Sequence, residues 1–208
     1  MEGREERTPA KALAICGSPR AESNTRCYLE AALDVLRERG VETEFVALEG
    51  RDIRSCKACY ACWRSGEAVC QLTGDDFPGI YQKMVAADAI LVGSPVHYGA
   101  VHPDLWSVLV RAGFPSMVGH PNSPPRPFSR KIGGPITVAR RAGQNSALAQ
   151  LLLWFHINEF VVPGSVYWTV GVARSIGDAA NDAEGLLTVR RFAENVAWLL
   201  ERTQAASS

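Results

Sequence analysis

The sequence predicts an α/β fold in which helices cover both faces of a parallel β-sheet. Segments with the composition of strands alternate with segments of helical periodicity along most of the 208 residues, as in a parallel sheet with helical crossovers. Residues 89–93 form a continuous apolar run, which is expected of a strand buried on both faces. Hydrophobic residues make up 47% of the chain and charged residues 21%, so the composition excludes wholesale disorder.

The first half of the chain contains three expected strands and two expected helices. Residues 11–16 are a short apolar run that stops at a Gly-Ser-Pro turn, which indicates a buried strand. Over residues 23–40 leucines recur at helical spacing, between a serine suited to an N-cap and a glycine suited to a C-cap. Residues 42–48 are rich in β-branched and aromatic side chains and predict the second strand. A helix over residues 75–87 then leads to the third strand at 89–93.

The second half of the chain continues the alternation. We expect a helix over 103–112, a strand over 132–139, a helix over 145–159, a strand over 161–170 and a helix over 182–202. No internal repeat or low-complexity tract interrupts this pattern, and the length suits a single domain.

The expected domain covers residues 10–204 and follows a disordered tail over residues 1–9. Two long loops interrupt its alternation of elements, a cysteine-rich loop at 52–74 and a proline-rich loop at 114–130. The proline-rich loop has five prolines and no periodicity. Because a loop of this length in a compact domain usually serves a function, we expect it to be a lid or an interface arm.

Charge and hydropathy exclude several classes of partner. The 22 Lys and Arg residues balance the 22 Asp and Glu residues, so the chain lacks the basic surplus that a nucleic-acid or membrane partner would need. No apolar run approaches the roughly 18 residues of a membrane-spanning helix, and the charged N-terminus lacks a signal-peptide core. We therefore expect a cytoplasmic protein whose six cysteines are kept reduced rather than paired in disulfides.

A polar loop follows the first expected strand, at the sheet edge where α/β proteins bind their ligands. Gly17 permits its tight turn, and its side chains offer hydroxyl, amide and guanidinium donors: Ser18, Arg20, Ser23, Asn24 and Thr25. With the unpaired amides of a helix N-terminus, these donors suit a phosphate group. The loop matches neither the Walker pattern nor Gly-x-Gly-x-x-Gly. The alternative is that Ser23 only caps the helix and the other residues only form a turn.

The third expected strand is followed at the same edge by the sequence GSPVHYG, residues 93–99. This loop places an aromatic side chain and exposed backbone groups where a flat ring could dock. A phosphate-binding loop after the first strand and an aromatic loop after the third together describe a pocket for flavin mononucleotide (FMN).

These two loops resemble those of the NADPH-dependent FMN reductases among the flavodoxin-like proteins, and the resemblance extends over about residues 11–200. It implies a flavodoxin-like three-layer sandwich with a five-stranded parallel sheet in the order 2-1-3-4-5. It also implies that the five polar residues of the first loop hold the FMN phosphate. The flavin ring would be lined by Pro95, Val96, His97, Tyr98 and Gly99, and by a third loop with Arg140 and Gly143. Alternatively, either arginine of that third loop is a solvated surface charge.

Four cysteines of the 52–74 loop have the spacing C-x2-C-x2-C-x7-C: Cys56, Cys59, Cys62 and Cys70. Three cysteines at three-residue intervals converge on one face of a tight turn, which suits three corners of an iron–sulfur cube. Zinc sites more often use two separated C-x2-C pairs. The alternatives are a zinc site or four free thiols. Cys16 and Cys27 lie on an expected strand and an expected helix, so we interpret them as core residues.

The cysteine motif resembles that of the iron–sulfur flavoproteins, whose four closely spaced cysteines hold a [4Fe-4S] cluster. The resemblance assigns the four cysteines as metal ligands and implies a tetramer in which a neighbouring subunit brings cluster and flavin together. Asp75 and Asp76 stand where those proteins carry an acidic pair, and we interpret them as a helix N-cap. We expect a homo-oligomer, either a dimer or a tetramer. The apolar helix over 148–157 is either its interface or a helix buried within the monomer.

The chain departs from the resembled pattern around the flavin. His97 replaces a residue that is often aromatic, His102 stands where small hydroxyl residues are common, and Val110-Arg111 replaces a frequent Asp-Arg. No side chain stands out as a catalytic group except His97, which could protonate a reduced acceptor. The alternative is that His97 hydrogen-bonds its own loop.

We therefore expect an FMN-dependent oxidoreductase with a [4Fe-4S] cluster that passes electrons from a ferredoxin or NAD(P)H to a small acceptor. The resemblance implies oxygen, peroxide, or a quinone-like or other organic oxidant as the acceptor. Two alternatives stay open. One is a cluster-free NAD(P)H-dependent reductase of flavins, quinones or azo compounds, and the other is a thiol or zinc redox sensor.

Overall fold

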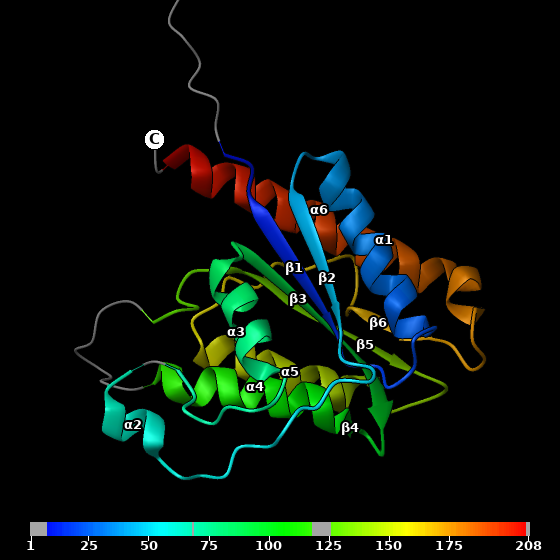
Figure 1. Cartoon of the computed structure of the whole chain (residues 1–208). Coiled ribbons are helices and arrows are strands. Elements are labelled where there is room, and N and C mark those ends of the chain that lie inside the picture. The colour runs from blue at the N-terminus through cyan, green and yellow to red at the C-terminus, as the bar shows by residue number, and fades with distance from the viewer. Residues whose placement is uncertain (1–7, 68, 118–125, 207–208) are drawn as a thin grey trace, which may run out of the picture.

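The computed structural model describes residues 8–67, 69–117 and 126–206 and confirms the flavodoxin-like three-layer architecture (Figure 1). The strands are β1 (Lys11–Cys16), β2 (Glu42–Ala47), β3 (Ala89–His97), β5 (Ile132–Ala139) and β6 (Val170–Val172). They pair in parallel in the order β2-β1-β3-β5-β6. Counted along the chain without the short β4, these five strands have the expected order 2-1-3-4-5. A two-residue strand, β4 (Ala100–Val101), pairs antiparallel with the end of β3.

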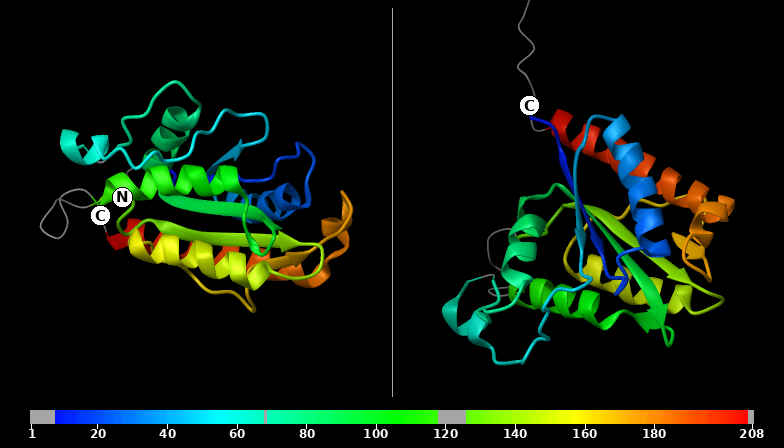
Figure 2. Two further views of the ribbon diagram at one scale, coloured as in Figure 1. Left: turned by 90° about the horizontal axis from the view of Figure 1, so that it is seen from below. Right: turned by 45° about the vertical axis from the view of Figure 1, so that its right-hand side comes forward.

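The helices are α1 (Asn24–Glu38), α2 (Ala61–Ser65), α3 (Phe77–Ala86), α4 (Pro103–Ser116), α5 (Gln144–Ile157) and α6 (Ala183–Ala206), with a 3-10 helix η1 (Asp178–Asn181). Helices α1 and α6 cover one face of the sheet, and α3, α4 and α5 cover the other (Figure 1). The short helix α2 and its loop lie at the periphery of the molecule (Figure 2). Within the described ranges, no helix is long and apolar enough to cross a membrane.

The core consists of two apolar clusters, one on each face of the sheet. Successive residues of a strand point to opposite faces. Ala12 and Ala14 of β1 therefore pack in the cluster shared with α1 and α6, whereas Leu13 and Ile15 pack in the cluster shared with α3, α4 and α5. All four are at most 2% exposed. Burial on both faces explains why the central strands are continuous apolar runs rather than alternating ones.

The expected strand over 161–170 is wrong. Among the described residues of that segment, Val161 makes an isolated bridge to Ile132, and regular pairing with β5 begins only at Val170. Pro163 and Gly164 interrupt the segment, because proline has no N–H to donate to a ladder and glycine weakens a strand. The loop that reaches the carboxyl edge of the sheet therefore follows residue 172.

The third strand is longer than expected and ends in a tight hairpin. Beyond residue 93 it continues to pair with β5, and then, through His97 and Ala100, with β4. Tyr98 and Gly99 form the two-residue turn, with φ of 52° and 78°. Positive φ at both central positions is the type I′ geometry, which matches the twist of the flanking strands.

The two long loops are partly ordered into helix. The expected loop at 114–130 begins later, because α4 extends to Ser116 and contains Pro115 in its last turn. The missing N–H of Pro115 removes one hydrogen bond from that turn, and the helix ends one residue later. Residues 118–125 of the expected lid lie outside the described residues, as do residues 1–7 of the expected tail. The cysteine-rich loop contains α2, which was not expected. The remaining helices match their expected ranges to within a few residues.

Candidate functional site

Four segments at the carboxyl edge of the sheet enclose a pocket of about 460 Å³. It is lined by Ser18, Pro19, Arg20, Ser23, Asn24 and Thr25 after β1, by Pro95, Val96 and His97 of β3, by Val138, Ala139 and Arg140 at the end of β5, and by Ala173, Arg174, Ser175 and Ile176 after β6. All of the predicted cofactor-binding residues line this pocket except Tyr98, Gly99 and Gly143. The structure thus brings together three loops that the sequence could only place at the same edge.

The three exceptions shape the rim of the pocket. Gly143 caps the start of α5 with φ of 93°, and a Cβ there would lie 3.0 Å from Val96 Cγ1 and 3.1 Å from Gly99 Cα. Its lack of a side chain therefore lets the loop after β5 approach the hairpin that follows His97. Tyr98, at the tip of the hairpin, is fully exposed.

The first loop is held in place by close backbone packing. Gly17 N donates a hydrogen bond to Gly93 O at 2.8 Å, and a Cβ on Gly17 would lie 2.6 Å from Leu105 Cβ. Ser18 Oγ accepts from Arg20 N at 3.2 Å, and Ser23 Oγ accepts from the N–H of Arg26 at 3.2 Å as the N-cap of α1. Both serine hydroxyls thus have structural bonds in addition to facing the pocket.

Asn24 joins the first loop to the last. Its Nδ2 donates to Ser175 O at 2.7 Å, and its Oδ1 accepts from Ala179 N at 3.1 Å. The side chain therefore closes the pocket on the side of β6, and its amide is already paired. The segment 173–176 is absent from the residues predicted for the site, because the sequence pattern predicts the last strand too early in the chain. The structure ends β6 at residue 172. Because ligands bind beyond the carboxyl ends of the strands, the segment 173–176 is then expected to line the pocket.

The pocket is electropositive. Arg20, Arg140 and Arg174 line it, and none of the described lining residues is acidic. The N-terminus of α1, a 15-residue helix, also opens at this edge. Unpaired helix amides, the positive end of the helix dipole and guanidinium groups all favour an anion such as a phosphate.

His97 lies in the wall of the pocket beside a second histidine. The rings of His97 and His102 are 4.9 Å apart between centroids. His102 caps α4, because its Nδ1 accepts from Asp104 N at 3.4 Å, and its own N–H donates to Ser94 Oγ at 3.0 Å. Burial lowers the pKa of His102 despite the nearby Asp104 carboxylate. The buried, neutral ring of His102 therefore packs against His97 on the side away from solvent.

The four cysteines of the motif line one separate pocket. Its other walls are Lys57 and Tyr60 near α2, Gln71 and Leu72 after it, and Arg111, Phe114 and Pro115 of α4. Cys62 is buried, Cys56 and Cys70 are partly buried, and Cys59 is exposed. As expected, Cys16 lies in the core on β1, while Cys27 of α1 is partly exposed. The structure therefore separates the four motif thiols from the other two.

The cysteine pocket is not a formed metal site. It has a volume of about 20 Å³, and the described residues include no group of three or more His, Cys, Asp or Glu side chains arranged to hold a metal ion. Its donor set is nevertheless purely thiol, the ligand type of iron–sulfur clusters. The loop is also in a strained form, since Ala58 and Tyr60 have φ of 48° and 55°. The residues present thus match a cluster in chemistry, and the loop would have to open to admit one.

A buried ion pair anchors the cysteine loop to α4. Arg111 and Asp75 have fully buried side chains and form a salt bridge through Arg111 Nη1. Burial alone would raise the pKa of Asp75, but hydrogen bonds from Arg111 and from the N–H of Arg54 hold it below its usual value. The interpretation of Asp75 and Asp76 as a helix N-cap is confirmed for Asp76, which is the N-cap residue of α3 although its side chain makes no cap bond, and is wrong for Asp75. The Asp75 carboxylate is instead paired with the Arg111 guanidinium. In the sequence, this pairing could have been suspected from a single arginine on the apolar face of a predicted helix.

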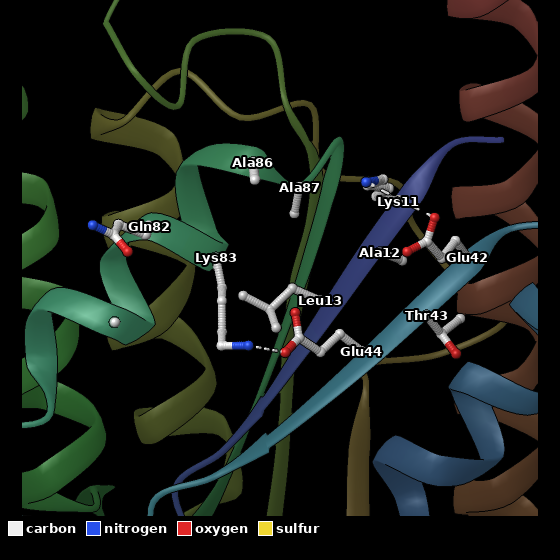
Figure 3. A pocket seen from close by; sticks show the side chains of 11 residues that line it. Lys11, Ala12, Leu13, Glu42, Thr43, Glu44, Gln82, Lys83, Ala86 and Ala87 are labelled. Carbon is white, nitrogen blue, oxygen red and sulfur yellow. Dashed lines mark hydrogen bonds and ion pairs between the residues drawn. The ribbon is translucent and has the colours of Figure 1, made fainter. Parts of the chain in front are cut away.

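Two other cavities offer less chemistry. The groove in Figure 3, between α3 and the β1–β2 edge, has its charges paired, with Lys83 Nζ bonded to Glu44 and Lys11 Nζ 3.9 Å from Glu42. A second groove between α4 and α5 is lined mainly by apolar side chains, among them the exposed Leu153 and Ile157. One face of α5 is therefore buried in the core, through Leu151, while another face exposes apolar side chains.

Comparisons with known proteins agree with this geometry. A family model described as NADPH-dependent FMN reductase matches residues 10–175. An iron-sulfur flavoprotein of Methanocaldococcus jannaschii is 34% identical over 194 residues, which cover 90% of this chain and 95% of that protein. An iron-sulfur flavoprotein of Methanosarcina thermophila is 32% identical over 196 residues, which cover 93% of this chain and 97% of that protein.

Solved structures show the same fold at lower identity. RosB with a bound flavin intermediate superposes with a TM-score of 0.74 at 20% identity, covering 94% of this chain and 81% of RosB. An NAD(P)H:quinone oxidoreductase from Methanothermobacter marburgensis superposes with a TM-score of 0.68 at 16% identity, covering 91% of this chain and all of that one. With the family match and the relatives above, these findings show that the chain is a flavin-dependent oxidoreductase that belongs to the NADPH-dependent FMN reductase family.

Proposed function

We propose that this chain is an electron-transfer flavoprotein that binds FMN at the carboxyl edge of its sheet and a [4Fe-4S] cluster on Cys56, Cys59, Cys62 and Cys70. It would pass electrons from a ferredoxin or NAD(P)H to a small acceptor, such as oxygen, peroxide or a quinone-like oxidant. The observation that carries the proposal is that four thiols of one motif line a pocket of their own, apart from the flavin-type pocket. The names of the curated relatives, iron-sulfur flavoproteins, support it.

The flavin side of the proposal rests on the lining of the larger pocket. Arg20 and Arg174, with the other polar side chains of the first loop and the N-terminus of α1, would bind the FMN phosphate. Arg140, in the loop after β5, would contact the flavin ring. Pro95, Val96 and His97 would line the ring, together with the apolar end of β5. His97, which also lines the pocket, would deliver a proton to an acceptor held at the flavin.

The two cofactors supply complementary chemistry, because a cluster exchanges single electrons and FMN exchanges one or two. The chain's own contribution is to hold the thiols and to tune their surroundings. Because metal binding and folding of a ligand loop are coupled, we expect the 52–74 loop to rearrange around the cluster. Its attachment to α4 through Arg111 would keep both ends of the loop in place during that change.

The two pockets lie at opposite ends of α4. His102 caps its start beside the flavin-type pocket, whereas Phe114 and Pro115 near its end line the cysteine pocket. A helix of 14 residues spans about 20 Å at 1.5 Å per residue. Such a separation within one chain favours a homo-oligomer in which a neighbouring subunit brings its cysteine loop to the flavin. The exposed apolar groove between α4 and α5 is the surface that would support this contact.

The test is to purify the chain anaerobically, reconstitute it with iron and sulfide, and measure its flavin, iron and acid-labile sulfide content. We expect one FMN per chain and about four irons per chain. Cys59→Ser should lose the iron and keep the FMN, whereas the matched control Cys27→Ser should keep both. A wild-type chain that binds FMN but takes up no iron would contradict the cluster.

That outcome would leave the second candidate function, a cluster-free reductase. It is favoured by the family description, NADPH-dependent FMN reductase. It predicts rapid reduction of bound FMN by NADPH, at the same rate in the wild type and in Cys59→Ser. Stopped-flow absorbance of the flavin measures this rate directly.

A further inference from the structure

Arg111 is the most constrained charged side chain among the described residues. It lies on α4 with no exposed side-chain surface. Its guanidinium carbon lies 4.0 Å from the centroid of the Phe77 ring. A buried cation in such surroundings is expensive unless its donors are paired.

Four of its five N–H donors are paired, all with the segment that carries or flanks the cysteines. Nη1 donates to Arg54 O at 3.0 Å and to Asp75, and Nη2 donates to Leu72 O at 2.7 Å and to Asp75 Oδ1 at 3.3 Å. Arg111 therefore binds the chain two residues before Cys56 and two residues after Cys70. In doing so it brings the two ends of the cysteine loop together.

The fifth donor has no partner. Among the buried side-chain nitrogen and oxygen atoms of the described residues, Arg111 Nε is the one left without a hydrogen bond. Arg111 lines the cysteine pocket, whereas its counter-ion Asp75 does not. Burial alone would lower the pKa of Arg111, but hydrogen bonding and charge from Asp75 and from Cys70 raise it, so the Cys70 thiol lies within reach of the guanidinium. The positive side of the ion pair thus faces the thiols, and a buried donor without a partner is rare in folded proteins, where a redox role or an absent ion or water is among its causes.

We propose that Arg111 is a positioning residue for the iron–sulfur cluster, and that its free Nε–H donates to the Cys70 sulfur or to a cluster sulfide. The inference rests on the proposed function, since it needs the cluster. Cluster potentials depend on net charge, on hydrogen bonds to sulfur and on solvent exposure. A buried cation with one donor directed at the sulfurs stabilises the reduced, more negative cluster and raises its midpoint potential.

The test is to compare the cluster midpoint potential of anaerobically reconstituted variants by redox titration. Arg111→Lys keeps the positive charge and a bond to Asp75 but has no planar fork and no Nε–H. We expect it to retain iron and sulfide while its one-electron reduction constant falls about tenfold, which corresponds to about 59 mV. A midpoint potential equal to that of the wild type, at equal iron content, would overturn the proposal.

Two further variants separate this role from mere anchoring of the loop. Asp75→Asn removes the negative partner and leaves Arg111 in place, so it should raise the midpoint potential, opposite to Arg111→Lys. If Arg111 only anchors the loop, both changes should loosen the loop and move the potential in the same direction. Lys57→Gln removes an exposed positive charge from the same pocket, and solvent screening should make its shift much smaller.

The iron content of the wild-type chain distinguishes a failure of the proposed function from a failure of the role proposed for Arg111. A wild-type chain without iron and sulfide overturns both the proposed function and this inference. A wild-type chain with a full cluster and an unshifted Arg111→Lys potential overturns this inference alone and leaves the proposed function standing. Thermal unfolding of the FMN-bound variants verifies that each is folded at the temperature of the titration.

Discussion

Asn24 and Ser175 are 151 positions apart in the chain, yet the Asn24 side chain donates to the Ser175 carbonyl oxygen at 2.7 Å. This bond, with the one from Ala179 N to Asn24 Oδ1, holds the loop after β6 against the loop after β1. The same side chain therefore links the two loops that carry Arg20 and Arg174, two cations that line the flavin-type pocket.

Asn24→Ala should therefore weaken FMN binding without unfolding the chain. Two hydrogen bonds of about 1 kcal/mol each are lost, so the dissociation constant should rise about tenfold or more. Fluorescence titration of the apoprotein with FMN measures this change. Asn195→Ala is the matched control, because Asn195 also donates to a loop carbonyl, that of Gly164, away from the pocket. Equal losses in the two variants would contradict the role of Asn24.

Arg174→Gln should discriminate between FMN and riboflavin. If Arg174 binds the phosphate, FMN affinity should fall about tenfold or more, because charge-assisted bonds contribute about 1.5–3 kcal/mol. Riboflavin has no phosphate, so its affinity should not change. Isothermal titration with both ligands is the measurement, and Arg191→Gln on the surface of α6 is the control. A parallel loss of riboflavin affinity would place Arg174 at the ring instead.

Asp75→Asn should destabilise the chain by about 3 kcal/mol or more, because it leaves the buried Arg111 cation unpaired. The pKa of Asp75 is lowered in the folded state, so its stabilising effect is fully present above its unfolded value near about 3.9 and is lost below it. The difference in urea midpoint between wild type and Asp75→Asn should thus shrink as the pH falls below about 4. Asp34→Asn, which breaks an exposed pair with Arg37, should change little at any pH. A difference independent of pH would contradict the assignment.

Tyr98→Asn should stabilise the chain, since Tyr98 has φ of 52° and asparagine tolerates the left-handed region better. A gain of about 1 kcal/mol would raise the melting temperature by about 2–4 °C. The Tyr98 side chain is fully exposed, so no packing is lost. Gly99→Ala, at φ of 78°, should act in the opposite direction.

The same variant tests the predicted contact between Tyr98 and the flavin ring. Because Tyr98 does not line the pocket of the single chain, FMN affinity should not change in dilute protein. A fall in affinity that appears only at concentrations where the chain associates would show that Tyr98 reaches the flavin of a neighbouring subunit.

The sequence by itself determined the fold class and the edge of the sheet at which ligands bind. Strand and helix periods are local properties of the chain, and Gly17, Ser23 and the C-x2-C-x2-C-x7-C spacing act over a few residues. Where a local signal was weak, as in the segment with Pro163 and Gly164, the strand was misplaced. The segment 173–176, including Arg174, was therefore not predicted as part of the site.

Only the tertiary structure decided which side chains are paired and which are free. Asn24 bonds across 151 positions and Arg111 reaches Asp75 across 36, and no local pattern encodes such partners. Burial then decides their energetics, because a charge is costly inside the protein and inexpensive in water. In the sequence, Arg111 could be identified only as the second residue of Val110-Arg111, a pair that departs at Val110 from a frequent Asp-Arg. Packing of α4 against the cysteine loop is what makes it a buried cation with one donor left free.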